Sequence, residues 1–360
     1  MSKAVYFPQL DTLRTIAAFG VINLHWLNSE YPSLFGIDHE SAWDFGKYGV
    51  QLFFVLSGFL ITDILIRHKH GTSRKRLIRS FFVRRVLRLI PIYYLFLLFL
   101  LLLDVSYVSE HTAWFFTYTA NIRFWLSGGL VDVWSNHTWT LSIEEQFYLL
   151  FPFLMLFVRR KGEFIVVILF IVSALCFKAY HHDEALRYHL LIFAQTDMLG
   201  TGALLALLRI HRPRFFEALR TTTWRVIGSV SLGFCFLMFY TDQEGFLLHR
   251  LFDLCLLGGF TILVANTALG FEGWVGKVFE NGFLRYLGKI SYGLYLYHKI
   301  IPLTLLIVLN KLGIGIGNIL VYYLVNLALL LSLSHLSWQL LEKPIMRLKQ
   351  RFEYSNVSKA

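Results

Sequence analysis

Two ionisable side chains share an apolar stretch near the start of the chain. Arg14 and His25 lie in LDTLRTIAAFGVINLH, residues 10–25, with ten residues between them. Eleven helical steps of about 100° return the second side chain to within about 20° of the first, at a rise of roughly 16 Å. The spacing therefore predicts one helix that carries both side chains on one face, where ionisable groups in a membrane are costly and usually functional. The alternative is that Arg14 extends to the interface and His25 ends the helix.

His25 is the candidate catalytic base, because a histidine titrates near neutral pH and can accept a proton from a hydroxyl. Two adjacent carboxylates, Glu144 and Glu145, lie in the apolar stretch SIEEQFYLLFP of residues 142–152. Counted inward from Trp139, they are roughly 7–9 Å deep, which is close to the depth expected for His25. One of them could hold the imidazole in its working tautomer. The alternative is that both only lie at the interface.

Arg85 and Arg88 are three residues apart in FFVRRVLRLIPIYY, residues 81–94, so they are neighbours on one helix face. Guanidinium groups bind phosphate oxygens in a bidentate way. The pair is therefore a candidate site for a phosphorylated ligand. An anchor that contacts lipid headgroups is an equally good interpretation of this pattern.

Five further residues are candidates for binding an acceptor or supporting the site: Ser57, His137, Trp139, Tyr148 and Asp197. Ser57 and its neighbour Gly58 favour close helix packing and interhelical hydrogen bonds. Asp197 falls within the membrane, where an acid must be paired or line a water-filled cavity. His137 is an alternative base. The three cysteines lack metal-ligand spacing, so we expect no metal.

The elements that would position these residues are membrane-spanning helices. Of the 360 residues, 56% are hydrophobic and 16% are charged, whereas soluble domains carry about 25% charged residues. Long apolar runs recur along the chain, which predicts an all-α polytopic membrane protein. We expect ten spans, at residues 10–28, 47–66, 82–103, 139–158, 163–180, 188–208, 225–241, 247–269, 285–310 and 314–338.

The distribution of Lys and Arg predicts that both termini are cytoplasmic. When the spans alternate from a cytoplasmic N-terminus, 27 of the 34 basic side chains fall on the inner side, as the positive-inside rule requires. The net charge of +11 therefore reflects membrane loops rather than nucleic-acid binding. Residues 1–346 are expected to form the transmembrane domain and 347–360 a short cytoplasmic polar tail. The aromatic-rich outer segment 104–138 is either an interfacial belt or a lid over an acceptor.

These stretches, in this order, resemble the membrane acyltransferase 3 family over about residues 10–346. Arg14 and His25 match its motif of an arginine and a histidine ten residues apart, and Arg85 and Arg88 match its paired arginines. The stretches that resemble other family signatures are GVQLFFVLSGFLI, HTWTLSIEEQFYLLFP, TDMLGTGALLA, LGKISYGLYLYHKIIP and WQLLEKP. The chain departs from the family after His298, where Lys299 stands in place of the common aromatic residue.

The resemblance implies acyl transfer from cytoplasmic acyl-CoA to a hydroxyl, with acetyl-CoA as the expected co-substrate and no permanently bound cofactor. Family members acylate bacterial surface polysaccharides, Nod factors or macrolides, which implies a carbohydrate or glycolipid acceptor and a bacterial inner membrane. It also implies that His25 is the catalytic histidine with Arg14 as its motif partner. We expect Arg85 and Arg88 to hold the CoA phosphates. An acyl-histidine intermediate, and a reaction with both substrates on the cytoplasmic side, stay open.

The rival class is a transporter or flippase without acyl-transfer chemistry. Asp197 and His298, both within the membrane, would suit a proton-coupled carrier. Against it, no inverted repeat is evident, and the paired arginines suggest a phosphorylated ligand that is held at one surface. The sequence leaves open the acceptor, the acyl chain length, the oligomeric state, and which of Glu144 and Glu145 supports His25.

Overall fold

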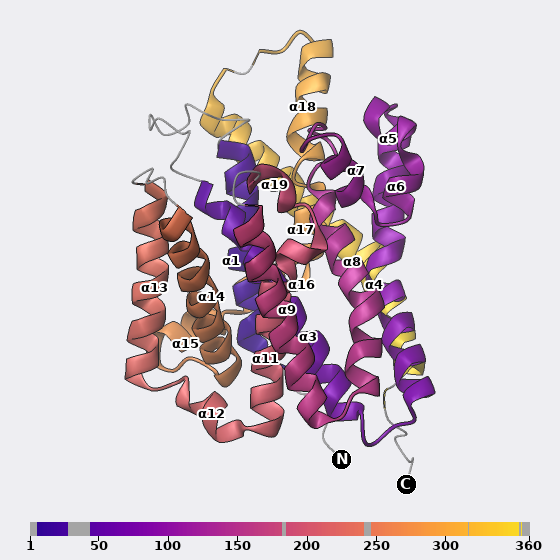
Figure 1. Cartoon of the computed structure of the whole chain (residues 1–360). Helices are drawn as coiled ribbons and strands as arrows, with labels where there is room; N and C mark the ends of the chain where they lie inside the picture. The colour runs from indigo at the N-terminus through magenta and orange to yellow at the C-terminus, as the bar shows by residue number, and fades with distance from the viewer. Residues whose placement is uncertain are drawn as a thin grey trace. The chain divides into compact units, whose positions relative to one another are not determined.

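The regular structure of the described residues is entirely helical. The structure is a computed structural model that describes residues 6–27, 44–181, 185–240, 246–315, 317–352 and 354. Its longer helices are α1 (Pro8–His25), α3 (Tyr48–His68), α4 (Arg74–Leu102), α8 (Thr138–Phe157), α9 (Arg160–Tyr180), α11 (Ile192–His211), α13 (Thr222–Tyr240), α14 (Phe246–Leu269), α18 (Ile300–Lys311) and α19 (Ile319–Ser337) (Figure 1). The shorter elements are η2 (Asp44–Lys47), α5 (Ser106–Glu110), α6 (Thr112–Phe116), α7 (Ala120–Leu126), α10 (Ala185–Tyr188), α12 (Pro213–Ala218), α15 (Gly273–Phe279), α16 (Gly282–Lys289), α17 (Ser291–Tyr297), η4 (Trp338–Glu342), α20 (Lys343–Arg347) and η5 (Leu348–Arg351).

Six helical stretches within the described ranges are long and apolar enough to cross a membrane: α3, α4, α8, α9, α14 and the run from α19 to η5. α17 and α18 pass the same test together, as a pair bent by 45°. α1, α11 and α13 are helical where spans were expected, but they fall short in length or hydropathy. The all-α class is therefore confirmed with six candidate spans. The count of ten and the cytoplasmic termini stay predictions.

The helices divide into two compact units. The first comprises Met1–Asp63, Arg160–Asp183 and Phe193–Ser291, and the second comprises Ile64–Arg159, Glu184–Ile192 and Tyr292–Ala360. The helix that carries Arg14 and His25 therefore belongs to the first unit. The paired arginines of α4 and the glutamates of α8 belong to the second.

In the first unit, small residues let α3 and α11 pack backbone to backbone. A Cβ atom on Gly58 of α3 would lie 1.9 Å from the carbonyl oxygen of Leu199, and one on Gly202 of α11 would lie 1.9 Å from that of Val55. Neither position can therefore hold a larger side chain without separating the helices. The close packing predicted at Ser57 and Gly58 is confirmed at Gly58. α13 and α14 lie side by side in the same unit (Figure 1).

In the second unit, the aromatic-rich segment 104–138 folds into the short helices α5, α6 and α7 and is tied to its neighbours through backbone carbonyls. The Tyr94 hydroxyl of α4 donates to the carbonyl of Phe116 at 2.8 Å. The Asn121 amide donates to the carbonyl of Leu190 at 3.0 Å. These bonds satisfy polar backbone groups that a loop would otherwise leave unpaired. The segment is thus an ordered part of this unit.

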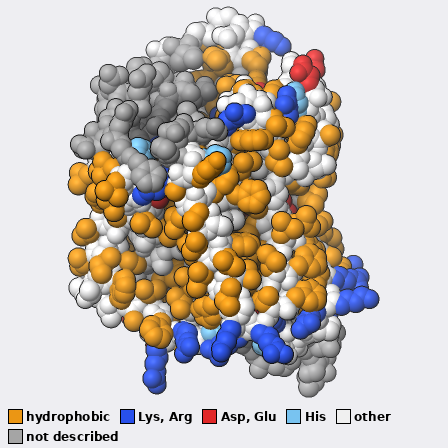
Figure 2. Space-filling model, viewed as in Figure 1, with side chains coloured by type: hydrophobic (Ala, Val, Ile, Leu, Met, Phe, Trp, Pro, Cys, Tyr) orange, Lys and Arg blue, Asp and Glu red, His pale blue; other side chains and the backbone are white. Residues whose placement is uncertain are grey.

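Large apolar side chains cover the outer surfaces of the helices in both units. Leu169 of α9 is 59% exposed and Val230 of α13 is 64% exposed. Figure 2 shows hydrophobic side chains over most of the face in view. Such surfaces are unfavourable in water and favourable against lipid, which agrees with helices that cross a membrane.

The topology can be tested on either side of α4, at Ser73 just before it and at Ser109 in α5 beyond it, both of which are exposed. After replacement of Cys176, Cys235 and Cys255, we expect Ser73→Cys to react only with membrane-permeant thiol reagents in intact cells. We expect Ser109→Cys to react with impermeant reagents as well, because a spanning α4 places its ends in different compartments. Labelling of Ser73→Cys alone by the impermeant reagent would reverse the predicted orientation.

Candidate active site

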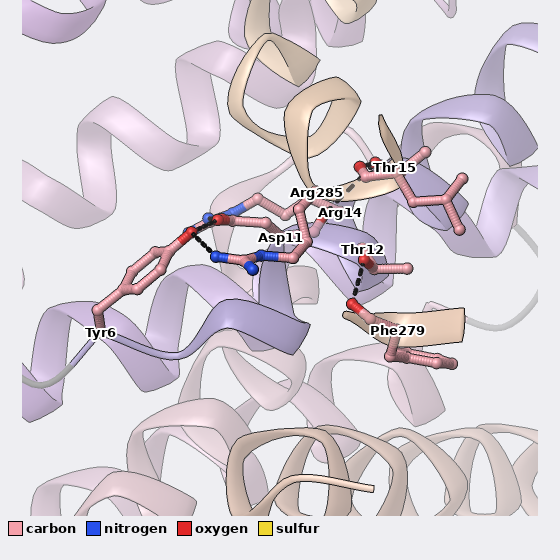
Figure 3. A network of polar contacts seen from close by, with 8 residues as sticks. Tyr6, Asp11, Thr12, Arg14, Thr15, Phe279 and Arg285 are labelled. Carbon is pink, nitrogen blue, oxygen red and sulfur yellow. Dashed lines mark hydrogen bonds and ion pairs between the residues drawn. The ribbon is translucent and has the colours of Figure 1, made fainter. Parts of the chain in front are cut away.

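The first turns of α1 carry a polar network around the carboxylate of Asp11, which is 4% exposed. Arg14 Nη1 lies 2.7 Å from Asp11 Oδ1. The Tyr6 hydroxyl donates to Asp11 Oδ2, and Arg285 Nη2 donates to the Tyr6 oxygen at 3.4 Å. Figure 3 shows these side chains converging from the segment before α1, from α1 and from α16. The charge of Arg14 is therefore compensated within its own helix, at a spacing of three residues that the sequence displays but that we had not used.

Hydrogen bonds to carbonyls fix the same half of α1 against residues 271–288. Thr12 Oγ1 donates to the carbonyl of Phe279 at 2.6 Å, and Thr15 Oγ1 donates to that of Leu284 at 2.7 Å. A Cβ on Gly288 would lie 1.8 Å from the carbonyl oxygen of Asp11, so α16 touches the α1 backbone directly. These polar contacts explain why α1 is weak by hydropathy. Its Thr and Asp side chains serve helix packing rather than lipid contact.

His25 is the last residue of α1, and the helix is continuous from Arg14 to it. The prediction that both residues lie on one helix is thus met. The imidazole is half-buried, and the next side chain, Trp26, is fully buried. Trp26 and Leu27 continue the helical chain beyond α1 in π-helical geometry. Residues 28–43, which follow along the chain, lie outside the described residues.

A glycine contact holds the segment before α3 against this end of α1. A Cβ on Gly46 would lie 2.1 Å from the carbonyl oxygen of Gly20 and 2.8 Å from Leu24 Cβ. Any side chain at Gly46 would therefore push η2 away from α1 within two turns of His25. The backbone around His25 is set by this contact and by the polar network at the other end of α1.

In the second unit, the structure brings Arg85 of α4 and two residues of α8 together. The guanidinium carbon of Arg85 lies 4.8 Å from the ring centre of Tyr148, within the range of a cation–π contact. Arg85 is also the cation that acts on the carboxylate of Glu145. The stacking on Tyr148 constrains the orientation of the Arg85 guanidinium. His25 belongs to the first unit, and Glu144 and Glu145 belong to the second. The support of His25 by one of these glutamates therefore stays a prediction.

Gln146, the next residue of α8, has a role that the sequence analysis missed. Its Nε2 donates to the carbonyl of Tyr118 at 2.9 Å and to Asn121 Oδ1 at 2.8 Å. Tyr118 has a φ of 54°, a left-handed conformation that is uncommon for any residue but glycine. The amide of Gln146 helps to hold this strained residue of the aromatic segment. A polar residue within an apolar stretch was the available signal.

Glu342, at the end of η4, is a buried carboxylate of the second unit. The Glu342 side chain is 4% exposed and accepts a hydrogen bond from Ser337 Oγ at 3.2 Å. Arg88 and Lys349 are the cations that act on this carboxylate. Lys349 was placed in a polar tail by the sequence analysis and was not considered as a site residue.

His137 lies just before α8 and is 2% exposed. Its Nε2 lies 3.1 Å from the carbonyl oxygen of Leu296, and its ring centre lies 5.1 Å from that of His298. A carbonyl only accepts, so Nε2 carries the proton and Nδ1 carries the lone pair. Nδ1 has no hydrogen-bond partner within the described ranges. Trp139, two residues further on, is half-buried.

Asp197 forms an ion pair inside the first unit. Its Oδ2 lies 2.6 Å from Lys178 Nζ, and the two side chains are 1% and 0% exposed. Oδ1 also accepts from the backbone amide of Met198 at 2.8 Å. Of the two expectations for an acid at this depth, pairing is the one observed. Asp197 thus joins α11 to α9, while Ser57 is half-buried in α3 beside the close contact at Gly58.

Comparisons with known proteins agree with one another. The profile of a family described as an acyltransferase domain matches residues 7–335. The O-acetyltransferase OatA of Staphylococcus aureus strains NCTC 8325 / PS 47 and COL is 30% identical over 371 residues, or 95% of this chain. A further relative in strain COL, whose O-acetyltransferase name is provisional, is 28% identical over 378 residues, or 96% of this chain. The chain spans 57 to 58% of the length of these relatives. No solved structure matches the chain.

The buried ion pair yields a stability prediction. Asp197→Ala leaves the charge of Lys178 buried without its carboxylate, so we expect a loss of about 3–5 kcal/mol in the free energy of unfolding. The measurement is denaturant unfolding of the purified protein in mixed micelles. The double variant Lys178→Met, Asp197→Leu is the control and should regain most of the loss, because it leaves no unpaired charge. A double variant as unstable as the single one would contradict the pairing.

Proposed function

The chain belongs to the acyltransferase domain family, and on that premise we propose that it is an integral-membrane O-acetyltransferase that uses acetyl-CoA. The observation that carries the proposal is the family match over residues 7–335, which includes every candidate catalytic and donor residue. The acceptor we propose is a hydroxyl of a carbohydrate or glycolipid. The proposed setting is a bacterial inner membrane, with the donor on the cytoplasmic side.

We assign the role of general base to His25. It would take the proton from the acceptor hydroxyl, whose oxygen attacks the thioester carbonyl carbon. A carbon–oxygen bond forms and the carbon–sulfur bond breaks, so that the proton held by the imidazole can pass to the leaving thiolate of CoA. The half-buried position of His25 at the end of α1 supports this role, since a partly exposed imidazole can be reached by the hydroxyl whose proton it takes.

Arg14 has a positioning role in this proposal. Its guanidinium is held by Asp11 at 2.7 Å, and Asp11 is part of the network that fixes α1 against α16. A helix that is fixed at its first turns presents the residue at its last turn in a defined orientation. Preorganisation of this kind lowers the cost of reaching the transition state.

Arg85 and Arg88 would bind the phosphates of the donor. The contact of the Arg85 guanidinium carbon with the ring of Tyr148, at 4.8 Å, supports this role, because it orients that guanidinium before the ligand arrives. Tyr148, His137 and Trp139 remain candidates for acceptor binding.

The alternative is a carrier without acyl-transfer chemistry, and one of the two residues that favoured it has a structural role. It relied on Asp197 and His298 as titratable groups within the membrane, and Asp197 is held by Lys178 at 2.6 Å. A direct test separates the two classes: release of CoA from acetyl-CoA by the purified protein with candidate glycans. Glycan-dependent release of CoA supports the enzyme, and its absence with every glycan, together with glycan transport in vesicles, supports the carrier.

Replacement of His25 tests the mechanism. We expect His25→Ala to slow acyl transfer by about 10²–10⁴-fold, the usual effect of losing a general base, while membrane insertion and acetyl-CoA binding are retained. His25→Gln should also fail, because an amide cannot take up a proton at neutral pH. The measurement is single-turnover transfer at saturating acetyl-CoA.

The α8 glutamates provide the comparison for this test. Glu144→Gln and Glu145→Gln, made separately, should be milder than His25→Ala if one of them only orients or stabilises the imidazole. The variant with the greater loss identifies that residue. A His25→Ala protein with near-normal single-turnover rate would refute the proposed role and direct attention to His137.

Replacement of the α4 arginines tests the donor site. Arg85→Ala and Arg88→Ala should each weaken acetyl-CoA binding by about 1.5–3 kcal/mol, the range for a hydrogen bond to a charged group. Lys at either position should rescue only in part, since an ammonium lacks the planar fork. The measurement is calorimetric titration of the folded protein. Unchanged affinity in the double Ala variant would place the donor elsewhere.

A further inference from the structure

We propose that Tyr118 is a catalytic residue whose hydroxyl donates a hydrogen bond to the thioester carbonyl oxygen of the acyl donor. The hydroxyl would stabilise the negative charge that this oxygen gains when the acceptor attacks. The inference rests on the proposed function and deepens it by naming a group that would contact the reacting atoms. The residues concerned all belong to the second unit.

The hydroxyl of Tyr118 is buried and has no hydrogen-bond partner within the described residues. The whole residue is 8% exposed, so bulk water does not satisfy this group. A buried hydroxyl that lacks a partner costs free energy, and such groups are rare in folded proteins. The protein therefore holds a hydrogen-bond donor that would gain stability from an incoming acceptor atom.

Two neighbouring tyrosines of α4 show that this is a property of Tyr118 and not of the region. The Tyr93 hydroxyl donates to the carbonyl of Phe115 at 3.2 Å. The Tyr94 hydroxyl donates to the carbonyl of Phe116 at 2.8 Å. Both of these hydroxyls fasten the aromatic segment to α4, so each has a structural task that Tyr118 Oη does not share.

The rest of Tyr118 is held firmly, in a conformation that is unfavourable for a residue with a Cβ atom. Its φ of 54° lies in the left-handed region. Its carbonyl accepts from Gln146 Nε2 at 2.9 Å, and its ring centre lies 4.4 Å from that of Tyr93 in a stacked arrangement. Strained residues persist where the surrounding structure holds them, and they cluster at functional sites. The fold thus fixes this side chain without using its hydroxyl.

The contacts of Tyr118 lie on the two helices that carry the proposed donor residues. Tyr93 and Arg85 are both in α4, while Gln146 and Tyr148 are both in α8. Arg85 and Tyr148 are themselves in contact at 4.8 Å. Tyr93 is eight residues beyond Arg85, a rise of roughly 12 Å along the helix. With the phosphates of acyl-CoA at Arg85, the pantetheine arm would carry the thioester toward Tyr118.

The proposed contact strengthens during the reaction. Attack of the acceptor oxygen on the thioester carbon turns the carbonyl oxygen into an oxyanion, which accepts a stronger hydrogen bond from the Tyr118 hydroxyl than the neutral carbonyl does. The intermediate then expels the thiolate of CoA and re-forms the carbonyl. Tyr118 keeps its proton throughout, so it acts as a hydrogen-bond donor and not as an acid.

The test compares two variants of the full chain in nanodiscs of phosphatidylcholine. Tyr118→Phe removes the hydroxyl that has no partner, and Tyr94→Phe removes one that is bonded to Phe116. We expect Tyr118→Phe to melt at the wild-type temperature or above it, because no buried donor is left unsatisfied, and Tyr94→Phe to melt below it. A Tyr118→Phe protein that is less stable than wild type, with unchanged kinetics, would assign the hydroxyl to a structural contact and overturn the proposal.

The chemical step is measured as single-turnover transfer to methyl glycosides at saturating acetyl-CoA. Tyr118→Phe should lower the rate by about 10²–10³-fold, the usual effect of losing one oxyanion donor. Tyr94→Phe is the matched control and should keep a rate near that of wild type. A higher KM for the glycoside with an unchanged rate at saturation would assign the Tyr118 hydroxyl to the acceptor and overturn the proposal.

Bound acetyl-CoA provides a readout that needs no acceptor. In isotope-edited infrared spectra, the acetyl carbonyl band should lie at a higher wavenumber in Tyr118→Phe than in wild type, because a hydrogen bond weakens the carbonyl bond. The affinity for acetyl-CoA should fall by about 2- to 10-fold. The affinity for S-ethyl-CoA, a thioether without the carbonyl, should not change. The same carbonyl band in both proteins would overturn the proposal.

Donor binding separates the possible failures. If the wild-type protein binds acetyl-CoA, and Tyr118→Phe changes neither the carbonyl band nor the transfer rate, this inference fails while the proposed function stands. If the wild-type protein does not bind acetyl-CoA, both fail. If it binds acetyl-CoA but transfers the acetyl group to no glycoside, the proposed acceptor fails and the carbonyl band alone decides the role of Tyr118.

Discussion

Charged groups inside a membrane bundle must be compensated by other protein groups, because hydrocarbon offers neither hydrogen bonds nor counter-ions. Much of this structure follows from that constraint. Lys178 and Asp197 meet at 2.6 Å with both side chains buried, and this pair joins α9 to α11. Asp11 is buried and is met by Arg14 at 2.7 Å. Without its partner, the charged residue in each pair would make burial of its helix in the bundle unfavourable.

The same constraint separates structural charges from charges that are available for chemistry. Lys178 and Asp197 satisfy each other, so they explain helix packing and need no ligand. The basic end of α4 is different. There the guanidinium carbon of Arg85 lies 4.8 Å from the ring centre of Tyr148, and a guanidinium that is stacked on a ring still presents its planar edge to an oxyanion. The donor role that we propose for Arg85 and Arg88 would use these positive charges.

Backbone carbonyls are the second means by which the parts of each unit are positioned. Thr12 and Thr15 donate to carbonyls at the end of α15 and in α16, and Arg84 donates to the carbonyls of Lys349 and Phe352. Gln146 does the same for the aromatic segment at Tyr118. These polar side chains hold neighbouring elements together by hydrogen bonds to backbone carbonyls. Their role is therefore structural. His25, at the end of an α1 that is fastened in this way, is our candidate for the reacting group.

Hydropathy predicted an all-helical membrane protein, and the motifs predicted its family. The apolar runs are local, so each of the ten expected segments overlaps a described helix, although six stretches are long and apolar enough to span a membrane. Arg14 and His25 share α1 because helical geometry depends only on residue spacing. The partners of the charged residues were not predictable in this way. Lys178 and Asp197 are 19 residues apart, and Arg84 and Lys349 are 265 residues apart. No periodicity relates such positions, and their meeting is decided by how the helices pack. Arg85 and Arg88 could therefore be named from their spacing, whereas the hydrogen bonds from Arg84 to the carbonyls of Lys349 and Phe352 join a helix to residues that the sequence placed in a polar tail.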